Sequence, residues 1–366
     1  MFKTEKPHIN GKYLYYAFIA GGNAILQHQT EINRINVFPV NDKDTGTNLA
    51  STIRAVIDNI KPHKSYKTTV NNIADAALIG ARGNSGVIFA QFLHGLSRET
   101  TNKTVITLPE FAESVEKSIP YIYEAITNPV EGTMLTVIKE WSAFLNAKKE
   151  AVYDFKNVII DSIVVLEKSL AETTSKLKAL NKSGFVDAGA KGFVLFIQGI
   201  IDFIKNRNIR NLVVEAEEGI SLIHTEELSS EEITHRFCTE AIVKNLNIKL
   251  IELQDILGKK GNSVVVAGSA GMCRIHVHTN HPAELFHQLK NVGTITFQKV
   301  DDMVRQQEAV TKRKWNIALV TDSTCDLPQE IIDYYQIHVL PINLNFGDNH
   351  YLDKVTIQPD QFYDLL

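Results

Sequence analysis

Apolar residues recur at every third or fourth position through about the first 210 residues of the chain, a spacing typical of amphipathic helices. In the stretch 84–98, for example, Val87, Ile88 and Phe92 fall on one helical face. Glycine and proline residues separate successive stretches and act as helix stop signals. We predict eight helices, at about residues 10–31, 46–60, 67–80, 84–98, 108–127, 133–149, 153–180 and 188–206.

Beyond residue 208 the pattern changes, because strand-like runs replace the helical spacing. One such run covers residues 263–268, and in the next, 272–279, apolar and polar residues alternate. A short helix is expected directly after the second run. These elements predict a small α/β or α+β middle domain at residues 215–305, after an all-α domain at residues 1–208.

A third segment begins near Trp315 with a run, 316–321, that is typical of a buried strand. A turn and a helix follow, and residues 337–344 form a second strand-like run, which makes this the start of a β-α-β unit. The segment 315–366 is too short to complete a parallel α/β domain, so we expect an incomplete module or a truncated sequence.

Composition narrows the class of protein further. The formal net charge of −4 gives no reason to expect nucleic-acid binding. No stretch has the length and apolar character of a signal peptide or a membrane span, so an integral membrane protein is not expected. The three cysteines, Cys238, Cys273 and Cys325, form no CxxC pair, which favours a reducing compartment. We predict a cytoplasmic protein.

Two acidic residues and a helix start predict a phosphate and metal site in the helical domain. Asp42 and Asp44 are two positions apart, so in an extended loop their carboxylates point the same way and could bind Mg²⁺. Residues 45–48 then begin a helix whose free backbone N–H groups suit a phosphate. An aspartate that merely caps the helix explains an isolated pattern of this kind about equally well.

Three further helix starts have the same polar, glycine-containing character, at residues 80–86, 131–136 and 187–192. Each of them alone is compatible with an ordinary turn between helices. If the eight helices alternate in direction, however, the second, fourth, sixth and eighth all begin at the same end of the domain. We therefore predict that the four helix starts meet in one cleft.

Together the four motifs resemble the nucleotide-binding domain of the dihydroxyacetone kinase family in its L-subunit (DhaL) form, and within it the bacterial fatty acid kinases. The resemblance implies an eight-helix barrel that binds ATP through two Mg²⁺ ions. It also implies that Asp42 and Asp44 are the catalytic metal ligands, with Asn36 near the third ligand position. The residues that would surround the nucleotide and its phosphates are Thr45, Gly46, Thr47, Asn48, Gly83, Asn84, Ser85, Thr133, Met134, Asp187 and Gly189.

Two residues depart from this family pattern, since Asn41 stands where the family has proline and Lys43 where it has glycine. Only glycine readily takes positive φ, so Lys43 is expected to strain or reshape the loop between the two aspartates. Its ammonium group could also compete with the metal or contact a phosphate directly. A nucleotide-binding regulator without turnover therefore remains an alternative to an active kinase.

A second metal site is predicted in the middle domain. His276 and His278 share one face of a strand, and Cys238 could add a thiolate to make a zinc-type set. From the residues alone, a polar strand surface is the more frequent explanation of a His-x-His pattern. The motifs around these residues resemble the fatty acid kinase middle domain, however, and this resemblance implies zinc at Cys238, His276 and His278.

The last segment resembles the opening of the DegV family of fatty-acid-binding proteins, from residues 320–328 to Tyr363. Asp322 and Ser323 follow a strand, at the position where ligands of α/β proteins usually bind. A capping turn explains these two residues equally well.

All these features predict an ATP- and Mg²⁺-dependent kinase that transfers the γ-phosphoryl group to the carboxylate of a protein-bound fatty acid, which gives an acyl phosphate. A fatty acid, or a DegV-type protein or domain that carries it, would be the partner, and we expect a homodimer. The alternative enzyme is a glycerone (dihydroxyacetone) kinase, although that reaction normally needs a substrate domain that holds the ketone covalently on histidine.

Overall fold

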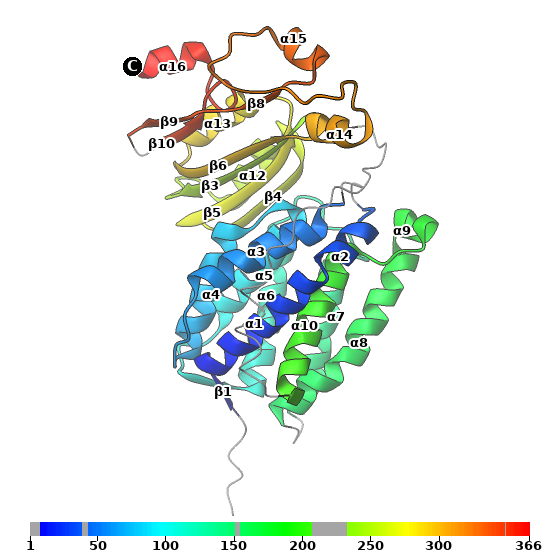
Figure 1. Ribbon diagram of the computed structural model, residues 1–366. Helices are drawn as coiled ribbons and strands as arrows, with labels where there is room; N and C mark the ends of the chain where they lie inside the picture. Colours follow the sequence, from blue (N-terminus) through cyan, green and yellow to red (C-terminus); the bar gives the residue numbers. More distant parts are fainter. Residues whose placement is uncertain (1–7, 39–42, 151–153, 207–232, 348) are drawn as a thin grey trace, which may run out of the picture. The chain divides into compact units, whose positions relative to one another are not determined.

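A computed structural model describes residues 8–38, 43–150, 154–206, 233–347 and 349–366. The chain divides into two compact units, Met1–Ile223 and His224–Leu366. The first unit is helical, and the second contains the sheets of the middle and C-terminal segments (Figure 1). The predicted multidomain organisation, helical first and sheet-containing afterwards, is therefore confirmed.

Each of the eight predicted helices has a counterpart in the first unit, but two of them are divided. Two three-residue strands, β1 (His8–Asn10) and β2 (Val105–Thr107), were not predicted, and they pair antiparallel. The helices are α1 (Gly11–Gln27), α2 (Gln29–Ile35), α3 (Thr45–Asn59), α4 (Tyr66–Gly80), α5 (Gly83–Glu99), α6 (Leu108–Glu124), α7 (Met134–Lys148), α8 (Phe155–Lys176), α9 (Lys178–Ser183) and α10 (Ala188–Asn206).

Local backbone conformation explains both divisions. His28 separates α1 from α2, and its ring Nδ1 lies 2.8 Å from the carbonyl oxygen of Ala24, which ties it back to the helix it ends. Leu177 separates α8 from α9 because it adopts an extended conformation, with φ −118° and ψ 126°. The first break matters for the site, since it redirects α2 so that Asn33 reaches the start of α3.

Helix α10 provides the centre of the helical core. Its sequence is apolar almost throughout, and the ring of Phe196 lies 5.2 Å from the rings of both Phe18 and Phe89. Phe193, one turn earlier, meets Phe92 and Trp141 edge to face. Such pairs of aromatic rings add stabilisation beyond that of burial alone, so α10 holds α1, α5 and α7 in a fixed relation. A closed eight-helix barrel stays a prediction.

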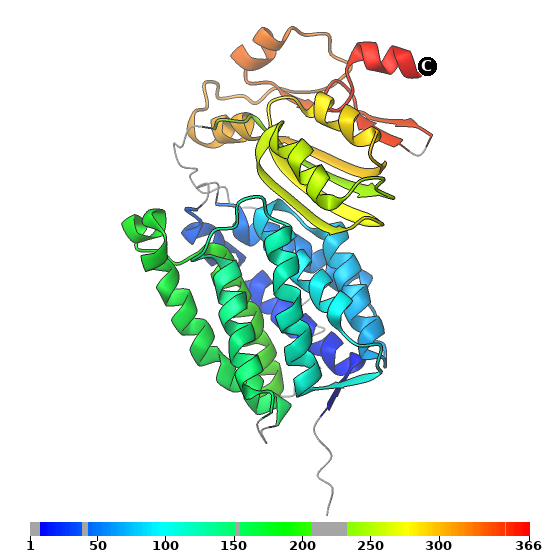
Figure 2. The same ribbon diagram turned by 180° about the vertical axis from the view of Figure 1, so that it is seen from behind.

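The second unit opens with a four-stranded antiparallel sheet in the order β4-β5-β3-β6. Helices α12 and α13 cover one face of it, as seen from behind in Figure 2, and the core between them includes Val243, Leu253, Ile275 and Phe286. The predicted alternation along β5 is confirmed, since Cys273, Ile275 and Val277 all belong to this core. The elements are β3 (Phe237–Lys244), α12 (Leu250–Gly258), β4 (Gly261–Ser269), β5 (Met272–Thr279), α13 (Pro282–Lys290), β6 (Thr294–Asp302) and α14 (Met303–Thr311).

The C-terminal segment contains the predicted β-α-β unit, because β7 and β8 are parallel and α15 connects them. One expectation is wrong: the run at 316–321 is not a buried strand, since Ile317 is 76% and Val320 61% exposed. Within the described residues β7 pairs with β8 alone, so no second neighbour covers it. The elements are β7 (Val320–Asp322), α15 (Gln329–Tyr334), β8 (His338–Leu340), β9 (Asn343–Phe346), β10 (Asn349–Leu352) and α16 (Pro359–Leu365).

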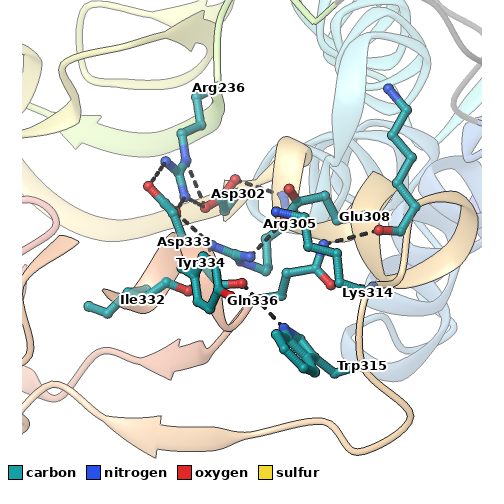
Figure 3. A network of polar contacts seen from close by, with 11 residues as sticks. Arg236, Asp302, Arg305, Glu308, Lys314, Trp315, Ile332, Asp333, Tyr334 and Gln336 are labelled. Carbon is teal, nitrogen blue, oxygen red and sulfur yellow. Dashed lines mark hydrogen bonds and ion pairs between the residues drawn. The ribbon is translucent and has the colours of Figure 1, made fainter. Parts of the chain in front are cut away.

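A network of four charged side chains fastens α15 to the middle-domain sheet (Figure 3). Arg236 donates to Asp302 at 2.7 Å and to Asp333 at 2.8 Å, and Arg305 donates to the same Asp333 oxygen at 2.6 Å. Partial burial acts to raise the pKa of Asp333, but the hydrogen bonds from Arg236 and Gln329 and the positive charges of Arg236 and Arg305 together outweigh it and lower that pKa. The folded state therefore stabilises the ionised form of the Asp333 carboxylate.

We expect the Asp333→Asn substitution to loosen this attachment at neutral pH. Asp333 is partly exposed, so the expected loss of stability is only about 1 kcal/mol, and it should appear first as faster hydrogen exchange of α15 amides. Because the folded-state pKa of Asp333 is lowered, the difference between wild type and variant should shrink as the pH falls through that pKa. Asp326→Asn, which removes an ion pair whose carboxylate is 95% exposed, is the control and should change little.

Candidate nucleotide and metal sites

The buried carboxylate of Asp187 connects the starts of two helices that are far apart in sequence. Its Oδ1 accepts hydrogen bonds from the backbone N–H of Ala190 at 2.7 Å, in α10, and of Met134 at 3.1 Å, in α7. The side chain therefore satisfies one otherwise unpaired donor at each helix start. The sequence predicts that Asp187 lies beside a nucleotide. In the structure its carboxylate holds the starts of the sixth and eighth predicted helices together.

Gly189 extends this junction to a third helix start. A methyl group added at its Cα would lie 3.0 Å from Cε of Met134 and 3.5 Å from Oγ of Ser85, in the first turn of α5. The starts of α5, α7 and α10 thus approach one another closely around Gly189, where even a methyl group would be in tight contact.

The start of α3 completes the group through Asn48. The side-chain amide of Asn48 lies against Gly83, where an added methyl group would be 2.2 Å from its Nδ2 atom. Gly83 has φ +55°, a conformation that favours glycine, and it begins α5. The four polar helix starts therefore meet at one end of the helical unit, as alternating helix directions predict.

Asp44 stands at the N-cap position of α3, but its carboxylate makes no capping hydrogen bond there. The capping explanation of this aspartate is thus not what the structure shows, and the partly buried carboxylate is available for a cation. Lys43 precedes it with φ +52°, which bears out the expected strain where the family has glycine. Asn41 and Asp42 lie outside the described residues, so the distance between the two carboxylates is not defined here.

The half-buried Thr47 is held by side chains of α2. Its backbone N–H donates to Oδ1 of Asn33 at 3.0 Å, and its hydroxyl accepts from Asn33 at 3.0 Å and from Gln29 at 3.2 Å. Sequence reasoning missed Asn33 and Gln29. The only available signal was their spacing of four residues, which places both on one face of α2.

The remaining predicted residues differ in whether their polar atoms already have a hydrogen-bond partner within the described part of the chain. Oδ1 of Asn84 is buried and has no hydrogen-bond partner among the residues that the structure describes, next to the half-buried Ser85. The hydroxyl of Thr133, in contrast, donates to the carbonyl oxygen of Val130 at 2.8 Å. Asn36 is 1% exposed and ends α2, while Thr45 and Gly46 are buried in the first turn of α3.

Burial raises the pKa of Asp187 from 3.8 to about 6, although the hydrogen bonds from Ala190 and Met134 work in the opposite direction. The unfolded chain therefore binds fewer protons than the folded one between about pH 4 and pH 6, and this term weakens stability as the pH rises. We expect Asp187→Asn, whose amide oxygen can still accept both bonds, to lack this loss. Thermal unfolding against pH should show the variant gaining on wild type across that window.

Asp187→Ala is the matched comparison, because it removes the acceptor as well as the charge. Relative to Asp187→Asn it should lose about 2–3 kcal/mol of stability at every pH, since two buried donors are then left unsatisfied. Parallel pH curves for wild type and Asp187→Asn would contradict the assigned titration.

A second cluster lies on the middle-domain sheet. Cys238, His276 and His278 each offer one ligand atom, and these atoms all lie within 4.8 Å of one another. Antiparallel pairing of β3 with β5 places Cys238 opposite His278. His276 is 2% exposed, so the alternative of a polar strand surface does not apply to it. One sulfur and two imidazole nitrogens at this separation fit the preferences of zinc.

The pKa values of the two histidines are shifted in opposite directions. Burial lowers the pKa of His278 to about 3, so this imidazole is neutral and able to bind a metal. Burial acts in the same direction on His276, but the Cys238 sulfur, 3.8 Å from Nδ1, and Glu240 raise that pKa to about 10. Positive charge is thus favoured where sulfur and carboxylate converge, and a metal dication would supply it. Nε2 of His276 is buried with no hydrogen-bond partner in the described part of the chain.

In the C-terminal segment, the capping-turn explanation describes Asp322, whose Oδ1 accepts from the backbone N–H of Thr324 at 3.0 Å. Ser323 is buried, and its hydroxyl accepts from the N–H of Ile342 at 3.0 Å. Both residues are thus engaged within the segment itself. No helix in the described ranges is both long and apolar enough to cross a membrane.

Three family models match successive parts of the chain. The DAK2 domain matches residues 39–202, the FakA-like middle domain of fatty acid kinases matches 234–310, and the uncharacterised DegV family matches 316–366.

Curated relatives include an uncharacterized protein of Staphylococcus epidermidis (strain ATCC 35984), 28% identical over 316 residues, which are 84% of this chain and 57% of that protein. An uncharacterized protein of Staphylococcus aureus (strain USA300) is 28% identical over 321 residues, 85% of this chain and 58% of that protein. The chain thus spans little more than half the length of these relatives. Among solved structures, dihydroxyacetone kinase from C. freundii in complex with AMP-PNP and Mg²⁺ matches with a TM-score of 0.42 and 14% identity, over 55% of this chain and 36% of that one.

Proposed function

We propose that this chain, which carries a DAK2 domain, a FakA-like middle domain and a DegV segment, is an ATP- and Mg²⁺-dependent kinase that phosphorylates the carboxylate of a fatty acid. The observation that carries the proposal is the meeting of four polar helix starts at one end of the helical unit. Helix starts present free N–H groups and a partial positive charge, and four of them together suit a triphosphate.

The residues at this end fit a nucleotide with its metal. The carboxylate of Asp44, uncapped and partly buried, would hold Mg²⁺ together with Asp42. Asn84 brings a buried amide oxygen, and Gly189 lets three helix starts approach one another closely. Bound Mg²⁺ would neutralise phosphate charge, while the helix starts orient the γ-phosphoryl group toward the acceptor.

The residue types in the four motifs bear on which chemical group accepts the phosphoryl group. None of them contains a histidine, and the carboxyl group of Asp187, whose pKa is raised, is buried and accepts two backbone hydrogen bonds. A fatty acid carboxylate is already ionised at neutral pH, so it can attack phosphorus without losing a proton. The hydroxyl group of dihydroxyacetone would need a base to take up its proton. The acyl acceptor therefore agrees better with these residues.

Turnover assays separate the proposed kinase from its alternatives. The full chain would be incubated with ATP, Mg²⁺ and either oleate bound to a DegV-family carrier or dihydroxyacetone. The proposal predicts ATP consumption that rises with oleate and is unchanged by the ketone. Stimulation by the ketone alone would favour a glycerone kinase. Nucleotide binding without turnover would favour a regulator, for which the strained Lys43 is the main structural argument.

In the second unit we propose that Cys238, His276 and His278 bind one zinc ion. Bound zinc would tie β3 to β5 through its three ligands, which is a stabilising role that needs no part in phosphoryl transfer. Elemental analysis of the full chain should give about one zinc per molecule, and Cys238→Ser should lower it while Cys325→Ser does not. A cytoplasmic location, consistent with three free cysteines, and a homodimer stay predictions.

A further inference from the structure

A buried ion pair lies directly beside the candidate zinc ligands. Arg274 Nη2 donates to Oε2 of Glu240 at 2.7 Å, and the two side chains are only 1% and 3% exposed. The other carboxylate oxygen, Oε1, lies 3.5 Å from Nδ1 of His276. Glu240 and His276 are cross-strand partners in the register of β3 and β5, so the backbone itself fixes this approach.

An aromatic ring also contacts Arg274, the cationic partner of this ion pair. The guanidinium group of Arg274 lies 4.6 Å from the ring centroid of Phe297, which belongs to β6, on the other side of β3 in the sheet. Packing over an aromatic face favours one position of the guanidinium group and therefore of the carboxylate it binds.

Stability alone does not account for charges in this place. Removing two charges from water is costly, and an apolar pair of similar volume usually stabilises a protein as well or better. The carboxylate does have one further effect, since it lies at Nδ1 of His276 and leaves Nε2, which is buried without a hydrogen-bond partner in the described part of the chain, for a metal. A carboxylate that accepts from the ring nitrogen not bound to the metal commonly fixes the ring and strengthens the bond of the other nitrogen to the metal.

We propose that Glu240, held in place by Arg274, is a positioning residue of the zinc site, which orients His276 and strengthens metal binding by it. The proposal rests on the zinc site proposed above. It adds that two residues outside the ligand set determine the affinity and geometry of that site.

The test compares the full-length Glu240→Gln variant with wild type in zinc affinity, measured by competition with a chromophoric chelator, and in the absorption spectrum of the Co²⁺-substituted protein. Affinity should fall by about 10–100-fold, and the cobalt bands should change, because the coordination geometry shifts. A change confined to folding stability would leave the spectrum of bound cobalt unaltered. Glu284→Gln, which removes an exposed carboxylate paired with Lys260 on α13, is the matched control and should behave as wild type.

If Glu240→Gln does not fold, the double variant Glu240→Gln with Arg274→Met removes both charges and should fold, because no uncompensated buried charge remains. It too should bind zinc more weakly. Wild-type affinity and an unchanged cobalt spectrum in either variant would overturn the positioning role while leaving the zinc site intact. Wild-type protein that takes up neither metal would instead contradict the site itself, and this inference with it.

Discussion

The Asp44→Asn substitution is expected to reduce ATP turnover by about 100-fold or more while the protein remains folded. The carboxylate is the described half of the proposed metal-binding pair, and an amide oxygen is a much weaker ligand for Mg²⁺. Stability should not fall, because Asp44 makes no capping hydrogen bond that the substitution could break, and asparagine is equally favourable at a helix N-cap. Steady-state ATP hydrolysis over a range of Mg²⁺ concentrations measures the effect.

Asp58→Asn provides the matched control, since this aspartate lies on the exposed face of the same helix, α3. It removes the same charge from the same helix at a distance from the helix start, and it should retain full turnover. Asp42→Ala should behave like Asp44→Asn if the two carboxylates share the metal. Wild-type turnover in either site variant would remove the metal assignment.

The second large effect is expected from Gly189→Val, which should weaken nucleotide binding by at least about tenfold. Even a methyl group at this position would touch Met134, Asp187 and Ser85 at 3.0–3.5 Å, so a larger side chain would displace groups at three helix starts. The helices themselves can remain formed, because the nearest atom, Cε of Met134, is the end of a flexible side chain. Calorimetric titration with Mg²⁺ and AMP-PNP measures the loss.

Gly258→Ala is the control for this variant, because a methyl group added there meets no atom within 4 Å. It should leave nucleotide affinity unchanged. Undiminished affinity in folded Gly189→Val would show that the nucleotide does not use the space between the helix starts.

The sequence predicted the helical unit well, because its helices carry strong apolar periodicity and clear stop signals. What it could not predict was the exact course of two of them. The break at His28 depends on a ring nitrogen near a carbonyl oxygen, and the break at Leu177 on an extended backbone that leucine does not favour in any obvious way. The prediction of a buried strand at 316–321 failed for a different reason. Apolar composition indicates a strand but does not indicate whether a neighbouring element covers it.

In the candidate sites, the residue types were predictable but their bonding was not. The alternating helix directions predicted that the four starts meet. The hydrogen bonds between Thr47 and Asn33, and between Asp187 and two backbone N–H groups, depend on contacts between distant segments. The positive φ of Lys43 followed from the comparison with glycine. The role of Glu240 was missed because only strand register places this residue beside His276.

The most direct measurement is a crystal structure of the full chain with AMP-PNP and Mg²⁺. The account predicts phosphates between the starts of α3, α5, α7 and α10, with metal bound by the carboxylates of Asp42 and Asp44. A nucleotide bound elsewhere, or metal that neither carboxylate touches, would contradict it.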